Sequence, residues 1–258
     1  MLSARDIHVA QRVHTTIEIA AILLFGSAIL LVALLRGRRR LAVGVATIIV
    51  GSTFTAEVLK RVLARPALVH GAPLKQAATF PSGHTTIAMA LGVGAMLVAP
   101  RRLRGVCATV GVVFTAMVAC SLVMTASHRP SDTIGSVLLV TVWTALVATA
   151  LIHSTTAPAR PRPAWARVSP WMALTGACLL VAAFLGTVIV AVAIHRGRLD
   201  TVELGRAFAT AASAIVGATA LCTAALLAAL HHVDLDKPAR IERRTEQSLV
   251  GAVPFSAG

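Results

Sequence analysis

Seven long apolar stretches constrain the fold of this chain more strongly than any other feature of its sequence. Their approximate bounds are 15–35, 41–59, 85–99, 105–126, 133–152, 171–194 and 207–230. Most of them approach the roughly 20 residues that a helix needs to cross a bilayer, and only 13% of the 258 residues are charged. Because lipid cannot satisfy backbone N–H and C=O groups, such stretches are expected to be helical. We therefore predict an all-α, polytopic membrane bundle of about seven transmembrane helices.

The connections between the stretches divide the chain into four parts. Residues 1–153 are predicted to form the main membrane bundle, and residues 171–231 to add two further transmembrane helices. Residues 154–170 are rich in Pro and Arg, which predicts an extended linker along the cytoplasmic face. Residues 232–258 form a polar C-terminal tail.

The net charge of +14 is spread over the short connections and is not gathered on one polar module, so nucleic acid is not an expected partner. If the spans alternate, 14 of the 24 Lys and Arg residues lie on one side of the membrane. The positive-inside rule places that side in the cytoplasm, with the N-terminus outside. All four cysteines lie within apolar stretches, where thiols act as small hydrophobic groups, and their spacing indicates no metal site.

Three polar segments interrupt the apolar pattern, and the span count places all three on the outer side. Their sequences are EVLKRVLARP at 57–66, PSGH at 81–84 and SHRPSD at 127–132. Polar residues at membrane depth cost about 2.5–3.5 kcal/mol each on insertion scales, so they indicate function unless another explanation is found. A single His at a helix end is usually a solvated or capping residue, but the three segments together favour a site.

The second segment predicts an anion-binding helix start. Pro81 ends the incoming loop, Ser82 is a favourable N-cap, and Gly83 permits close approach to the backbone. The free N–H groups of such a terminus bind phosphate well. His84 lies on the first turn, where it could donate a proton to the group that the phosphate is attached to.

The other two segments supply the groups that phosphate chemistry needs. His128 and Asp132 are four residues apart, a spacing that lets the carboxylate orient one imidazole nitrogen and leave the other free to attack. Lys60 and Arg65 bring positive charge to the same side. Glu57 lies one turn before them, as an ion-pair partner for Lys60 or Arg61.

These residues resemble the type 2 phosphatidic acid phosphatase (PAP2) superfamily, whose members are membrane enzymes that dephosphorylate lipid phosphates and diphosphates. The family pattern is K-x6-R-P, then P-S-G-H, then S-R-x5-H-x3-D. The matching residues here are Lys60 in the first block, Pro81 to His84 in the second, and Ser121, His128 and Asp132 in the third. The resemblance covers about residues 41–152.

Two arginines of the family pattern are missing from this chain. Ala67 and Leu122 stand where the pattern has the arginines that hold the phosphoryl oxygens. Arg65, in an Arg-Pro pair two residues early, and Arg129, directly after His128, are the candidates to replace them. Bidentate Arg to phosphate is hard to replace, so slow turnover or an unusual substrate would follow if neither does.

The resemblance implies a metal-independent hydrolase without a cofactor. His128 would attack phosphorus to form a phosphohistidine, Asp132 would orient it, and His84 would protonate the leaving oxygen. Phosphate would be bound by Lys60, Ser82, the Gly83 backbone N–H, and Arg65 or Arg129. We expect an integral protein of a bacterial plasma membrane, surrounded by membrane lipids, with its site facing outward.

The substrate and two other function classes stay open at this stage. Phosphatidate, phosphatidylglycerophosphate, and polyprenyl phosphates or diphosphates all fit, and the sequence does not define an oligomeric state. A weak or inactive PAP2-like protein that binds or transports lipid phosphates would fit the missing arginines. A vanadium haloperoxidase is the third class, and an assay of bromide oxidation with added vanadate would test it.

Overall fold

The computed structural model describes residues 22–63, 79–153, 168–197 and 200–230, and within these ranges every regular element is a helix. The helices are a segment at Ile22–Leu35, α2 (Arg39–Val62), α3 (Gly83–Val98), α4 (Arg104–Met124), α5 (Pro130–His153), α6 (Val168–His195) and α7 (Thr201–Leu230). Five of them are long and apolar enough to cross a membrane, whereas Ile22–Leu35 and α3 are shorter apolar helices. The prediction of an all-α membrane bundle is confirmed.

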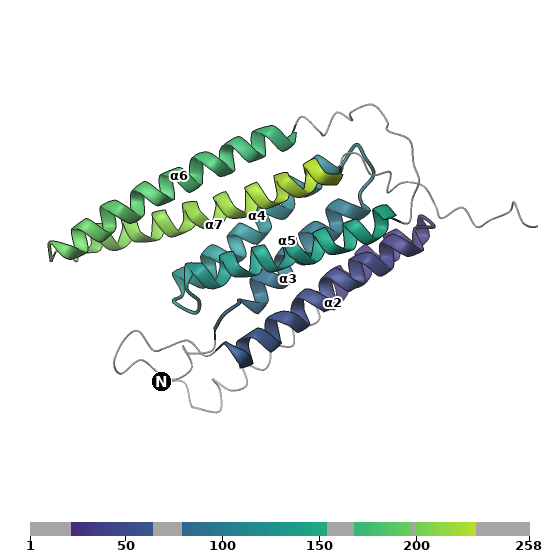
Figure 1. The fold of residues 1–258 in the computed structure, drawn as a ribbon, viewed down its shortest axis with the longest axis horizontal. Helices are drawn as coiled ribbons and strands as arrows, with labels where there is room; N and C mark the ends of the chain where they lie inside the picture. The colour runs from purple at the N-terminus through teal and green to yellow at the C-terminus, as the bar shows by residue number, and fades with distance from the viewer. Residues whose placement is uncertain (1–21, 64–78, 154–167, 198–199, 231–258) are drawn as a thin grey trace, which may run out of the picture.

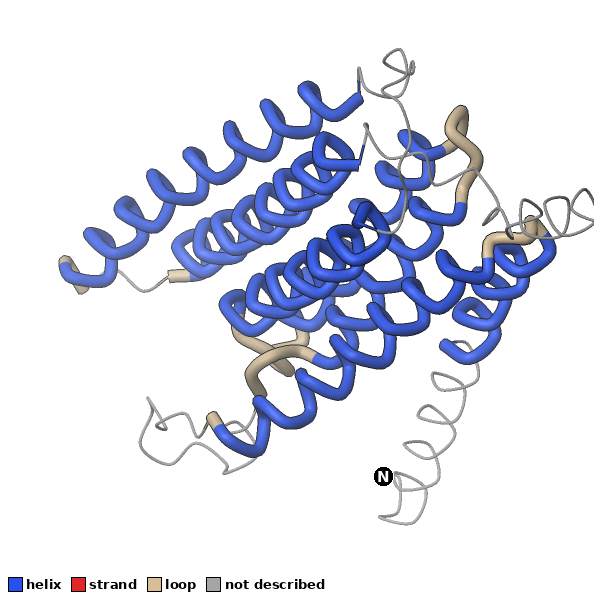
Figure 2. The backbone as a smooth tube through the Cα atoms, turned by 45° about the vertical axis from the view of Figure 1, so that its right-hand side comes forward, coloured by secondary structure: helices blue, strands red, loops and turns tan. Residues whose placement is uncertain are grey.

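The helices pack around α3, which contacts α2, α4 and α5. Helix α7 packs against α4 and α5 on the far side from α2, and α6 lies outside α7 (Figure 1). The tip of the α6–α7 hairpin extends past the connection between α4 and α5 in both Figure 1 and Figure 2. Most large apolar side chains of α6 are exposed on the bundle surface, as expected for side chains that face lipid.

One hydrophobic core joins the helices on both sides of the linker. It includes Ile48 of α2, Met89 of α3, Val137 of α5 and Leu227 of α7, each at most 1% exposed. The last two helices were predicted only as additions to the main bundle. The end of α7 packs into the same core.

Small residues allow the short helix α3 to lie close to α4. A Cβ atom added to Gly92 would lie 3.0 Å from the Cα atom of Gly111, and the same contact made from Gly111 would measure 3.1 Å. Small residues at helix crossings let membrane helices gain van der Waals contact without a hydrophobic driving force. Helix α3 is thereby held inside the bundle. Its polar start is surrounded by other helices and does not contact lipid, although the helix is short.

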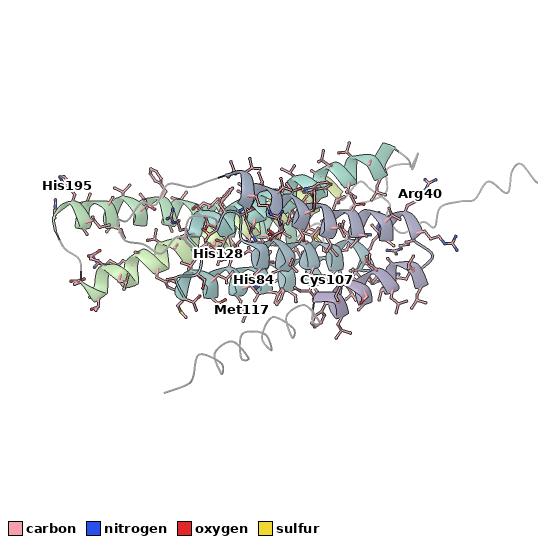
Figure 3. The ribbon with its side chains drawn as sticks, turned by 90° about the horizontal axis from the view of Figure 1, so that it is seen from below. Arg40, His84, Cys107, Met117, His128 and His195 are labelled. Carbon is pink, nitrogen blue, oxygen red and sulfur yellow. The ribbon has the colours of Figure 1, made fainter. Side chains whose placement is uncertain are left out.

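The two ends of the bundle differ in charge. Arg36 and Arg38 donate hydrogen bonds to the carbonyl oxygen of Val98, at the end of α3, over 3.2 and 3.3 Å. Figure 3 shows Arg40 toward this end and His84 and His128 away from it. The acidic residues of the described ranges are found at the other end, on the last turns of α2, the first turns of α5 and the tip of the α6–α7 hairpin.

Parts of the predicted organisation lie outside the described residues. They are the first 21 residues, Arg65 and the rest of 64–78, the linker at 154–167, and the tail after residue 230.

Candidate active site

The site is built on the start of α3, where the predicted N-cap is present. The Ser82 Oγ atom accepts hydrogen bonds from the backbone N–H of Thr85 at 3.4 Å and from the Thr85 hydroxyl at 3.2 Å. Both side chains are fully buried. The helix begins at Gly83, so its first free N–H groups and the positive end of its dipole lie where PSGH was predicted to bind an anion.

The start of α3 is tied to the start of α5 by hydrogen bonds that the sequence did not reveal. The backbone N–H of Ser82 donates to the Asp132 carbonyl oxygen at 3.2 Å. The hydroxyl of Ser136 donates to the carbonyl oxygens of Ser82 at 2.8 Å and Asp132 at 2.9 Å. Ser136 is completely buried and lies one turn after Asp132, which is the only sequence signal that could have identified it. These contacts fix PSGH and Asp132 relative to each other.

Asp132 and His128 form the central pair of the site. The distance from Asp132 Oδ2 to His128 Nδ1 is 3.6 Å, an ion-pair distance that is longer than a hydrogen bond. The same carboxylate oxygen accepts hydrogen bonds from the Thr79 hydroxyl at 2.8 Å and the Arg129 backbone N–H at 3.1 Å. Asp132 is 0% exposed and His128 is 14% exposed, so the carboxylate is held firmly beside a partly buried imidazole. Thr79 was not identified from the sequence.

The loop that carries His128 turns back on the end of α4. The backbone N–H groups of Ser127 and His128 both donate to the Leu122 carbonyl oxygen, at 3.0 and 3.2 Å. Ala126 enables this turn with a positive φ of 54°. Leu122 stands where the family pattern has arginine, and it contributes a carbonyl to the loop instead of a cation to the site.

Lys60 reaches the site from the last turn of α2. A Cβ atom added to Gly83 would lie 3.0 Å from Lys60 Nζ, so a glycine at this position leaves room for the ammonium group beside the first turn of α3. Lys60 Nζ forms an ion pair with Glu57 Oε1 at 2.5 Å. Of the two partners that the sequence offered to Glu57, the structure pairs it with Lys60.

The electrostatic environment favours a neutral imidazole at His128. Burial lowers the pKa of His128 most strongly, and the nearby charge of Asp132 opposes this effect. Electrostatic repulsion from the neighbouring His84 and Lys60 lowers the pKa of His128 further. His84 is exposed on the first turn of α3, and Figure 3 shows it beside His128. A neutral imidazole with Nδ1 turned to a carboxylate has Nε2 free to attack an electrophile.

The structure thus brings most of the predicted site residues to one end of the bundle. These residues are Lys60, Ser82, Gly83, His84, His128 and Asp132. Arg129 is half-buried next to His128, and its observed contact with Asp132 is made by its backbone N–H. Arg65 lies outside the described residues. The catalytic and phosphate-binding roles of all these residues stay predictions.

Comparison with known proteins identifies the same region. The model of the PAP2 superfamily matches residues 41–156, which include α2 from Leu41 onward and all of α3 to α5. Lys60, the PSGH segment, His128 and Asp132 all lie within this range. Helices α6 and α7 follow the matched region. No curated protein and no solved structure matches the chain. Residues 41–156 of the chain are therefore similar to the PAP2 superfamily.

Proposed function

We propose that the protein is an integral membrane lipid phosphatase that hydrolyses a phosphomonoester or diphosphate of a lipid through a phosphohistidine at His128. The observation that carries this proposal is the pairing of His128 with the buried Asp132, at 3.6 Å, beside the start of α3. The match of residues 41–156 to the PAP2 superfamily supports phosphatase chemistry in general. The bundle of apolar helices supports a substrate that is itself a lipid.

In the proposed reaction, His128 Nε2 attacks phosphorus while the bond from phosphorus to the leaving oxygen breaks. His84 donates a proton to that oxygen, and the lipid alcohol or lipid phosphate departs. Asp132 holds Nδ1 and stabilises the positive charge that develops on the imidazole. Water then attacks the phosphohistidine, His84 accepts a proton from it, and inorganic phosphate is released with His128 restored.

The phosphoryl oxygens would be stabilised by groups that are in place before the substrate binds. The N–H groups at the start of α3 and the Lys60 ammonium group lie next to one another. Each charge-assisted hydrogen bond contributes about 1.5–3 kcal/mol, and such preorganised contacts provide most of what phosphoryl transfer needs from a protein. Arg65 and Arg129 are the candidates to complete this set.

The orientation in the membrane follows from the charge of the two ends. The end that holds Arg36, Arg38 and Arg40 would lie in the cytoplasm under the positive-inside rule. The site at the opposite end would then face the extracytoplasmic side of a bacterial plasma membrane. A cysteine introduced at the exposed position Ser131 should react with a membrane-impermeant maleimide in intact cells if this orientation is right.

Phosphate release from the purified full chain tests the proposed activity. The protein in detergent would be given phosphatidate, phosphatidylglycerophosphate, a polyprenyl phosphate and a polyprenyl diphosphate. We expect release from at least one lipid, and the His84→Ala variant should lose more activity on poor leaving groups than on good ones. His195→Ala is the control, because Figure 3 shows His195 far from His84 and His128.

One observation favours a second candidate, a PAP2-like protein that binds or transports lipid phosphates without efficient turnover. Leu122 places an apolar, half-buried side chain where the family pattern has an arginine. If the wild-type protein binds lipid phosphates but releases phosphate from none of them, this second candidate replaces the phosphatase.

A further inference from the structure

The described site contains one charged group that the proposed reaction does not use. Glu57 lies one turn before Lys60 on α2, with its side chain 51% exposed. Its Oε1 atom is 2.5 Å from Lys60 Nζ. The same oxygen would lie 3.7 Å from a Cβ atom added to Gly83. A carboxylate therefore lies against the first residue of α3, beside the groups that are proposed to bind phosphate.

The carboxylate of Glu57 resembles a phosphoryl group in its negative charge and in its oxygen acceptors. Its oxygens accept hydrogen bonds from an ammonium group with the same geometry as phosphoryl oxygens. Lys60 has three N–H donors but one positive charge, so a phosphoryl group that binds there must share that charge with Glu57. The two anions would then repel each other across a short distance, and the repulsion grows with each negative charge that the substrate brings.

The positive charge available to balance this repulsion is smaller than the family pattern provides. Leu122 carries no charge, and the charge of Lys60 is already matched by Glu57. A terminal diphosphate carries about one more negative charge than a monoester near neutral pH. The carboxylate of Glu57 should therefore weaken the binding of a diphosphate more than that of a monoester.

We propose that Glu57 is a specificity-determining residue, a resident anion that competes with the phosphoryl group for Lys60 and makes the site prefer lipid phosphomonoesters to diphosphates. The preference among substrates rests on the proposed phosphatase function. The competition for Lys60 does not, because it concerns binding alone.

Binding of inorganic phosphate to the full chain in detergent tests the competition directly. The Glu57→Gln variant keeps the size of the side chain and removes its charge. We expect it to bind phosphate about three- to tenfold more tightly in titration calorimetry, the order of effect for removing one partly solvated charge about 4 Å away. If Glu57 serves only to hold Lys60 in place, the variant binds phosphate more weakly, which would overturn the proposal. Unchanged affinity would overturn it as well.

The selectivity is tested with a matched pair of lipids, a polyprenyl phosphate and the diphosphate of the same alcohol. We expect Glu57→Gln to raise the ratio of kcat/KM for the diphosphate over the monoester by at least about threefold. Glu57→Asp keeps the charge and should leave the ratio close to that of the wild type. A parallel change of both kcat/KM values in Glu57→Gln, with a constant ratio, would contradict a role in specificity.

A second ion pair in the molecule provides the control. Glu203 and Arg206 form the same i,i+3 arrangement at 2.6 Å on the first turns of α7. Figures 1 and 2 place this end of α7 at the tip of the hairpin, away from the start of α3. Glu203→Gln should therefore change neither the phosphate affinity nor the ratio. If the wild type releases phosphate from no lipid, the proposed function fails, but the phosphate titration still decides the role of Glu57.

Discussion

A larger residue in place of Gly135 of α5 is expected to lower the activity, although Gly135 is not a proposed site residue. A Cβ atom added there would lie 2.4 Å from Phe80 Cε2 and 2.7 Å from Phe80 Cζ, distances that real Cβ atoms do not adopt. The ring must move in a Gly135→Ala variant. Phe80 directly precedes PSGH, so its movement would disturb the hydrogen bonds from Ser82 and Ser136 that fix the start of α3. Forced overpacking of this kind costs about 1–3 kcal/mol.

We predict that Gly135→Ala lowers kcat/KM by at least about tenfold, the equivalent of about 1.4 kcal/mol, and lowers Tm in detergent. Gly205→Ala is the matched control, because a Cβ atom added at Gly205 of α7 meets no atom within 4 Å. Alanine is favoured over glycine in helices by about 1 kcal/mol, so this control should keep its activity and should not have a lower Tm. Adding Phe80→Leu to Gly135→Ala should restore part of the lost activity, which a double-mutant cycle would measure. Wild-type activity and Tm in Gly135→Ala would show that the contact between Phe80 and Gly135 does not position the start of α3.

Three further predictions concern the site itself. The acidic limb of the profile of kcat/KM against pH should have its midpoint below about 6.5, the ordinary pKa of histidine, because burial lowers the pKa of His128. Lys60→Met removes a positive charge, so it should raise the pKa of His128 and move that midpoint to higher pH. Ser136→Ala should lower Tm and reduce kcat several-fold, because each lost hydrogen bond to the start of α3 or α5 contributes about 0.5–1.5 kcal/mol. Unchanged Tm and kcat would argue against a positioning role of Ser136. Arg129→Ala should lower kcat/KM at least about tenfold if its guanidinium group replaces a missing family arginine, and normal activity would show that it does not.

The helices were predictable because each depends on local composition. The seven apolar stretches are all helical where the structure describes them, and most boundaries differ by only a few residues. The start of α3 was predictable for the same reason, since Ser82 caps the helix with groups three residues away. Sequence spacing also indicated the pairing of His128 with Asp132, which lie one turn apart.

The individual hydrogen bonds and packing contacts between distant segments were not predictable, because no local pattern determines them. Thr79 and Asp132 are 53 residues apart, and Ser136 and Ser82 are 54 apart, yet both pairs are hydrogen-bonded at the site. The contact between Phe80 and Gly135 is of the same kind. The sequence offered Glu57 two partners on its own helix, and only the position of Gly83 shows that the ion pair lies against α3.

The proposed phosphatase reaction requires that His128 becomes covalently phosphorylated during turnover. The most direct test mixes the wild-type protein with a lipid phosphate that carries ³²P, at a protein concentration above that of the substrate, and stops the reaction in alkali within milliseconds to seconds. We predict labelled protein whose label is stable in alkali and lost in acid, as phosphohistidine requires, and neither label nor phosphate release with His128→Ala. Release of phosphate by His128→Ala at the wild-type rate would rule out His128 as the nucleophile.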